Sequence, residues 1–171
     1  RTRSPRQYAA GVRASIRRAF RHVGGTLVIA AAGVFGPLWI AWRRRRYRRM
    51  GRGLSSSEVE ALQGWFEPAL LARVRIAEVL CISPPLSSLG AGWLLRVLQL
   101  RGMLDVRSAS GMAFGDAIVI AAAGEPVSAS LLFHELVHTV QYRQLGLSRF
   151  CRAYVRGWLE AGRSYFDIPL E

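Results

Sequence analysis

Two successive patterns of apolar residues mark the first fifty positions of the chain. Apolar residues recur at helical spacing between arginines up to residue 23, and Ser4-Pro5 supplies an N-cap followed by a proline at the first helical position. This pattern predicts a basic amphipathic helix, which fits either the surface of an anionic membrane or a helix packed on the domain. The apolar stripe of this helix consists of Tyr8, Val12, Ile16, Phe20 and Val23.

Residues 24–42 then form a run of 19 residues without a charge. The run is close to the ~20 residues that span a bilayer core. Trp39 and Trp42 lie near its end, where aromatic side chains favour the membrane interface. A proline interrupts the run, so a buried helix or a helical hairpin is the alternative. The arginine block at 43–49 that follows fits a membrane flank better than a nucleic-acid site, because only one aromatic residue is interleaved with it.

Shorter periodic segments in residues 53–171 predict a small α+β domain. A capping-box pattern begins a helix, an alternation of charged and apolar residues predicts a half-buried strand, and a hairpin or strand pair precedes a second amphipathic helix. An edge strand beside that helix could bind an extended peptide by strand addition. The expected elements are a helix over 55–71, broken near Pro68 and burying Trp65, Phe66, Leu70 and Leu71; a strand over 73–79; a helix over 92–101; strands within 103–106 and 111–122; a helix capped by Ser128 or Ser130 that stops at Gly146; and a helix from about Arg149, capped by Ser148.

Charge divides the chain at the same place as the apolar pattern. Residues 1–52 hold 14 arginines and no acidic residue, whereas residues 53–171 hold 10 arginines and 11 acidic residues, a net charge of −1. We therefore expect a basic and apolar N-terminal region that binds membrane lipid, followed by a near-neutral globular domain. The two cysteines, Cys81 and Cys151, are compatible with one disulfide or with two thiols.

The helix that stops at Gly146 carries the pattern His-Glu-x-x-His. On a helix, His134 and His138 point the same way and can share one zinc ion. Glu135, beside the first histidine, can act as general base on a zinc-activated water. The alternative is an ordinary helix whose two histidines are satisfied by hydrogen bonds. An apolar face turned away from the histidines is expected from Phe133, Leu136, Val137 and Val140.

A zinc site of this kind needs a third protein ligand. The position six residues after His138 is Gln144, and the remaining histidine, His22, lies in the basic region, so a third histidine is disfavoured. A carboxylate downstream of the motif is the expected ligand. The acidic residues that remain are Glu160, Asp167 and Glu171.

The sequence around the motif resembles a known family. The stretch LLFHELVHTVQYRQLG, the aromatic-rich helix after it and the terminal IPLE are similar to gluzincin metallopeptidases. They are most similar to small bacterial metallopeptidase domains related to the one associated with extracellular contractile injection systems. The strand GMAFGDAIVI is similar to the family's glycine-containing edge strand. The resemblance implies a zincin-like α+β fold with a few-stranded sheet, Glu135 as general base, and Glu171 as the third ligand beside His134 and His138; Glu160 is the alternative ligand.

These observations lead us to expect a membrane-associated bacterial zinc metallopeptidase that hydrolyses a peptide or protein substrate. Tyr154 or Tyr165 could stabilise the oxyanion, with a core aromatic role as the alternative. Gln141 could orient a ligand or the substrate, or be a solvated surface residue. A second hypothesis is a non-catalytic, zinc-stabilised module anchored to a membrane or carried by a secretion or toxin system. A third is a membrane or nucleic-acid-binding arm with an incidental motif.

Overall fold

The computed structural model describes residues 5–82, 110–121, 127–160 and 168–171, with side chains from residue 24 onward. The elements expected at 92–101 and 103–106 lie outside the described residues, as do Tyr165 and Asp167. The described part is a mixed α+β fold with a three-stranded sheet and a helical N-terminal region, as the sequence predicts. The finer prediction of a zincin-like fold, and the division of the chain at residue 52, stay predictions.

The sheet has the order β1-β3-β2 and is mixed in direction. Strand β1 (Arg75–Val79) pairs in parallel with β3 (Ala117–Ala121), and β2 (Gly111–Phe114) pairs with β3 in an antiparallel hairpin. The hairpin turn contains Gly115 at a φ of +68°, a conformation that favours glycine. The sequence predicts a hairpin or strand pair from segments 103–106 and 111–122; the structure instead folds residues 111–121 into a hairpin of their own, and the predicted partner at 103–106 lies outside the described residues.

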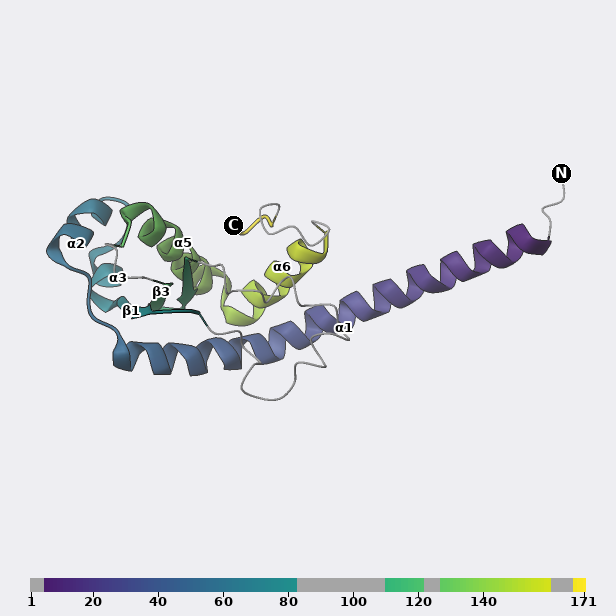
Figure 1. The fold of residues 1–171 in the computed structure, drawn as a ribbon, viewed down its shortest axis with the longest axis horizontal. Coiled ribbons are helices and arrows are strands. Elements are labelled where there is room, and N and C mark those ends of the chain that lie inside the picture. The colour runs from purple at the N-terminus through teal and green to yellow at the C-terminus, as the bar shows by residue number, and fades with distance from the viewer. Residues whose placement is uncertain (1–4, 83–109, 122–126, 161–167) are drawn as a thin grey trace.

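Helices cover both faces of this sheet (Figure 1). Ala117 and Val119 of β3 pack with Ile40 and Tyr47 of α1 (Pro5–Met50) on one face. The alternate residues Ile118 and Ile120 pack on the other face with α2 (Ser56–Leu62), α3 (Pro68–Arg73) and α5 (Ala129–Leu145). The first strand is half-buried, as predicted, but its burial does not alternate: Ile76 and Ala77 point to opposite faces and both are buried, whereas Glu78 is exposed.

Helix α1 is one continuous helix, which excludes the predicted alternative of a helical hairpin. Pro37 lies inside it and has no N–H for the carbonyl of Gly33. The hydroxyl of Ser148 donates to that carbonyl at 2.7 Å instead, so the gap in the helical ladder is filled from another helix. By length and composition alone, Gly24–Met50 of this helix could cross a membrane; core helices of soluble proteins and signal sequences share these properties.

The helix expected over 55–71 is divided into α2 and α3. Ser55 and Glu58 form the predicted capping box, and Pro68 opens α3. Gly64, at a φ of +85°, turns the chain between the two helices. The predicted burial of Trp65 is wrong: its side chain is 73% exposed, because this turn takes it out of the helical register.

Two further helices complete the fold; both begin near the predicted positions, and the first also ends where predicted. Ser128 caps α5 and Gly146 ends it. The predicted apolar face of α5 is wrong in part, since Phe133 is exposed and the buried side carries Leu132, Leu136 and polar residues instead. Helix α6 (Leu147–Glu160) starts before Ser148, so this serine does not cap it as predicted. Cys81 and Cys151 are both free thiols.

Candidate metal centre

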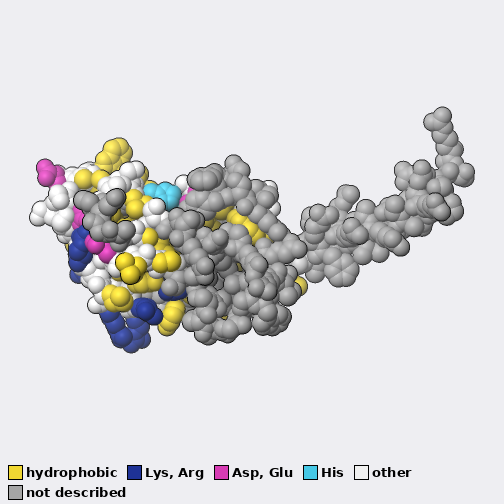
Figure 2. All heavy atoms as spheres, viewed as in Figure 1, with side chains coloured by type: hydrophobic (Ala, Val, Ile, Leu, Met, Phe, Trp, Pro, Cys, Tyr) yellow, Lys and Arg dark blue, Asp and Glu magenta, His cyan; other side chains and the backbone are white. Residues whose placement is uncertain are grey.

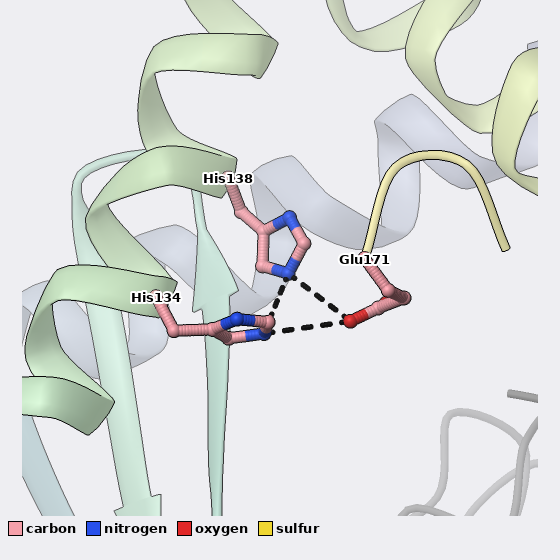
Figure 3. Close-up of side chains that lie close together, drawn as sticks. All are labelled: His134, His138 and Glu171. Atoms are coloured by element: carbon pink, nitrogen blue, oxygen red, sulfur yellow. Dashed lines mark hydrogen bonds and ion pairs between the residues drawn. The ribbon is translucent and has the colours of Figure 1, made fainter. Parts of the chain in front are cut away.

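The helical spacing of the motif places two imidazole nitrogens next to each other. His134 and His138 project from successive turns of α5, and their Nε2 atoms lie 3.1 Å apart (Figure 3). Both rings therefore offer the same nitrogen to the space between them. One helix face carries the pair because residues four apart lie one above the other.

A third donor comes from the far end of the chain. Oε2 of Glu171 lies 3.4 Å from Nε2 of His134 and 3.5 Å from Nε2 of His138 (Figure 3). Zinc bonds of about 2.0–2.1 Å in tetrahedral geometry place ligand atoms roughly 3.3–3.4 Å apart. The three donors thus form a triangle of the size that one zinc ion requires, with a fourth position left over for water or substrate. The residues present fit zinc.

Gln141 holds the ring of His138 in place from one turn further along α5. Its Oε1 lies 2.9 Å from Nδ1 of His138, so the ring can donate an Nδ1 proton there, the arrangement in which Nε2 is the nitrogen available to a metal. Its Nε2 donates to the carbonyl of Leu170 at 3.2 Å. One amide therefore ties the histidine helix to the segment that carries Glu171.

The segment of Glu171 is fixed mainly by α6. Ile168 is buried against Trp158, and Pro169 lies so close to Gly157 that a Cβ there would come within 2.9 Å of its ring. The hydroxyl of Tyr154 donates to Oε1 of Glu171 at 2.7 Å, which leaves Oε2 directed at the histidines. Tyr154, predicted as an oxyanion donor or core aromatic, therefore orients the carboxylate in this structure.

Glu135 is the buried carboxylate of the site, with 3% of its surface exposed. Burial raises its pKa to about 7; nearby His138 and the backbone N–H of Ala113 lower it, and the charge of Glu171 raises it. Its Oε1 lies 2.7 Å from the point that a Cβ on Gly111 would occupy, and its buried Oε2 has no hydrogen-bond partner among the described residues. A carboxylate with this pKa can take up and release a proton near neutral pH.

The edge strand β2 is partly engaged by α5. The hydroxyl of Tyr142 donates to the carbonyl of Ala113 at 3.0 Å, and the N–H of Ala113 interacts with Glu135. The hydroxyl of Thr139 donates to the carbonyl of Gly115 at 2.7 Å. These contacts fix the position of α5 beside the strand. They also occupy the carbonyl and the N–H of Ala113, which are the backbone groups that an added peptide strand would pair with.

Access to the donors is from the side of His134. Its side chain is 39% exposed, whereas the side chains of His138 and Glu171 are 10% and 8% exposed. Figure 2 shows histidine at the surface, with hydrophobic side chains nearby. Phe133, next in sequence to His134, packs its ring on Trp65 and Phe66 at centroid distances of 5.7 and 5.2 Å. Three aromatic rings thus form a cluster on α5 beside the position of His134 in the sequence.

The other sequence-predicted candidates fall elsewhere. Glu160, the alternative third ligand, is exposed at the end of α6 and does not belong to the donor group. Gln144 is exposed. Tyr165, Asp167 and the side chain of His22 are outside the described residues.

Two glycines that shape the site were missed by the sequence analysis. Gly111 makes room for the carboxylate of Glu135, and Gly157 makes room for Pro169 two residues before the third ligand. A glycine inside an apolar strand or helix is the only signal either one leaves, and it does not say what approaches. The chain matches no protein-family model, no curated protein and no solved structure.

Proposed function

We propose that the protein is a zinc-dependent hydrolase of peptide bonds. The observation that carries the proposal is the triangle of His134, His138 and Glu171, with a buried carboxylate, Glu135, adjoining it. A site that only held metal for stability would have no use for a second, desolvated carboxylate with a pKa near neutrality.

The residues divide the chemistry between them. When bound, zinc would supply Lewis-acid activation of a water and of the scissile carbonyl. Glu135 accepts the proton of the attacking water and donates it to the leaving amine. Gln141 keeps the ring of His138 in the tautomer that binds metal, and Tyr154 keeps Glu171 aimed at it. Because the side chain of His134 is exposed, the substrate can reach the site from that side.

Metal content and hydrolysis are measured together to test the proposal. The chain is purified without chelator, assayed for zinc by mass spectrometry, and incubated with a library of quenched fluorescent peptides. We expect about one zinc per chain in the parent and in Glu135→Gln, none in His138→Ala, and hydrolysis by the parent alone. Zinc-loaded Glu135→Gln that still cleaves would overturn the mechanism.

A second function is supported by the position of the donors. The ligands join α5 to the C-terminal segment, so bound zinc would link two elements that are distant in sequence. A non-catalytic, zinc-stabilised module would make use of this link alone. In that case zinc would raise the melting temperature of the parent and of Glu135→Gln equally. Neither protein would cleave a peptide.

We also propose that the reaction takes place at a membrane. Helix α1 has the length and composition to reach into a bilayer, and it leaves large apolar side chains uncovered. The lipid partner expected for residues 1–52 follows from the same helix together with its arginines.

A further inference from the structure

The apolar part of α1 has two opposite sides in this fold. Five large apolar side chains are 51–67% exposed and recur along one side of the helix. At 3.6 residues per turn, the buried residues Gly33, Ile40 and Tyr47 fall on the other side. The exposed stripe is formed by Leu27, Val34, Phe35, Leu38 and Trp42. It is roughly 22 Å long, at 1.5 Å per residue.

The buried side of α1 is docked by specific contacts, beginning with α6. A Cβ on Gly36 would lie 2.6 Å from Sγ of Cys151, so the two helices approach as closely as glycine allows. Ser148 donates to the carbonyl that Pro37 leaves without a helical partner. In hydrocarbon that carbonyl would lack this partner, which is costly to a helix surrounded by lipid.

Charged contacts dock the C-terminal part of the helix on the sheet. The carboxylate of Asp116, 7% exposed, accepts two hydrogen bonds from Arg44, at 2.6 and 2.8 Å, and one from Arg48. Arg43 is buried on the same side, with its guanidinium group 5.3 Å from the ring of Trp42. A helix that crossed a bilayer over Gly24–Met50 would have to break these pairs and uncover the sheet.

Exposed arginines continue the stripe at its C-terminal end. Arg45, Arg46 and Arg49 are exposed, and Figure 2 shows basic side chains gathered where α1 ends. An apolar stripe followed by a basic end is complementary to acyl chains below anionic headgroups, and each surface arginine adds to the attraction. Protein partners would require acidic groups in register, whereas an anionic bilayer offers charge everywhere along its surface.

We propose that α1 binds an anionic bilayer in the plane of one leaflet while it stays docked on the domain, with its exposed stripe among the acyl chains. The proposal rests on the membrane location proposed above and is independent of zinc. It places the sheet between the bilayer and α5, since α1 and α5 cover opposite faces (Figure 1). The metal donors then face the aqueous side, and the substrate is a chain presented outside the bilayer.

A reversible lock on α1 separates in-plane binding from spanning. In full-length protein carrying Cys81→Ser, the variant Gly36→Cys places a thiol against Cys151, with the Cβ atoms 3.0 Å apart before a slight separation to the 3.5–4.5 Å of a disulfide. Sedimentation with vesicles of phosphatidylglycerol and phosphatidylcholine is then compared in the oxidised and reduced forms. We expect equal binding in both forms. Binding by the reduced form alone would mean that α1 must leave the domain, and would overturn the proposal.

Surface variants test the stripe without disturbing the docked side. We expect Phe35→Ser with Leu38→Ser to weaken vesicle binding by about tenfold or more per side chain. The control Leu80→Ser removes a side chain that is 95% exposed and lies outside α1, and it should bind as the parent does. Arg45→Gln with Arg49→Gln should lose the preference for phosphatidylglycerol over pure phosphatidylcholine.

The remaining outcomes identify other partners of the stripe. A parent that binds no vesicle, and whose mass by light scattering falls from dimer to monomer in the stripe variant, would mean that a second copy covers the stripe. That result would overturn both the membrane location and the in-plane proposal, and would leave the zinc chemistry intact.

Discussion

Helices α5 and α1 depart from the usual rule of apolar inside and polar outside in opposite directions. Helix α5 buries Glu135, His138 and Thr139. Helix α1 exposes apolar side chains such as Phe35 and Leu38. Buried polar groups and exposed apolar patches are the informative departures in a globular protein. Here they fall on opposite faces of one sheet, which separates the chemistry that we propose from the surface that we assign to lipid.

The two departures are stabilised in different ways. The polar groups of α5 and its partners satisfy one another, as in the contact of Gln141 with His138 and that of Tyr154 with Glu171. The apolar side chains of the stripe on α1 are not covered by other parts of the fold and remain 51–67% exposed. In the two proposals above, a small ion therefore completes the site on α5, whereas an extended apolar surface covers the stripe on α1.

The largest effect is expected from Glu171, the proposed third metal ligand. Glu171→Gln removes the only carboxylate in the described donor group, so zinc affinity should fall by more than the roughly 10–100-fold that loss of an orienting partner costs. Metal content by mass spectrometry checks the loss. Glu160→Gln is the matched control, and zinc that persists in Glu171→Gln but disappears in this control would reverse the assignment.

The next largest effect is expected when the contacts that dock α1 on the sheet are removed. Asp116→Asn leaves Arg44 and Arg48 without their carboxylate, and we expect a loss of about 2 kcal/mol in the free energy of unfolding by urea. The loss is moderate because both arginines can still reach water. Glu67→Gln, which removes an exposed pair with Arg143, should change the free energy by less than about 0.5 kcal/mol. Equal effects of the two variants would argue against a specific dock.

A smaller change sharpens the role of Gln141. We expect Gln141→Leu to weaken zinc binding by about 10–100-fold, because His138 loses the acceptor that sets its tautomer. Competition with a chromogenic chelator measures the affinity. Gln144→Leu, on an exposed position of the same helix, should leave it unchanged. A parent-like affinity in Gln141→Leu would show that the ring is held by packing alone.

The smallest effect is a pH dependence far from the site. Hydrogen bonds from Arg52 lower the pKa of Glu58 to about 2, against 4.5 for an ordinary glutamate, and burial opposes the shift. Since the folded pKa is the lower one, this stabilisation is fully present above about pH 4.5 and is lost as pH falls toward 2. Thermal unfolding of the parent and of Glu58→Gln across this range should converge at low pH. A gap of constant size would exclude the linkage.

Much of this arrangement is visible in the sequence, because it depends on local periodicity. The spacing of His134 and His138, the capping box at Ser55 and the helix stop at Gly146 follow from residues within one or two turns of each other. The placement of Trp65 and Phe133 was predicted wrongly for the same reason. The positive φ at Gly64 and the rotation of α5 that buries Glu135 depend on tertiary contacts. Local periodicity carries no information about those contacts.

By itself the sequence determined the candidate histidine pair, the adjoining glutamate, the basic and apolar character of α1 and the presence of β structure just before α5. From the residues alone it left three carboxylates open as the third ligand, and it did not say whether the apolar run is buried, spanning or docked. Only the tertiary structure brings Glu171 to the histidines and turns one side of α1 onto Ser148 and Asp116. These are contacts between residues tens to more than a hundred positions apart, set by how layers pack and not by any local pattern.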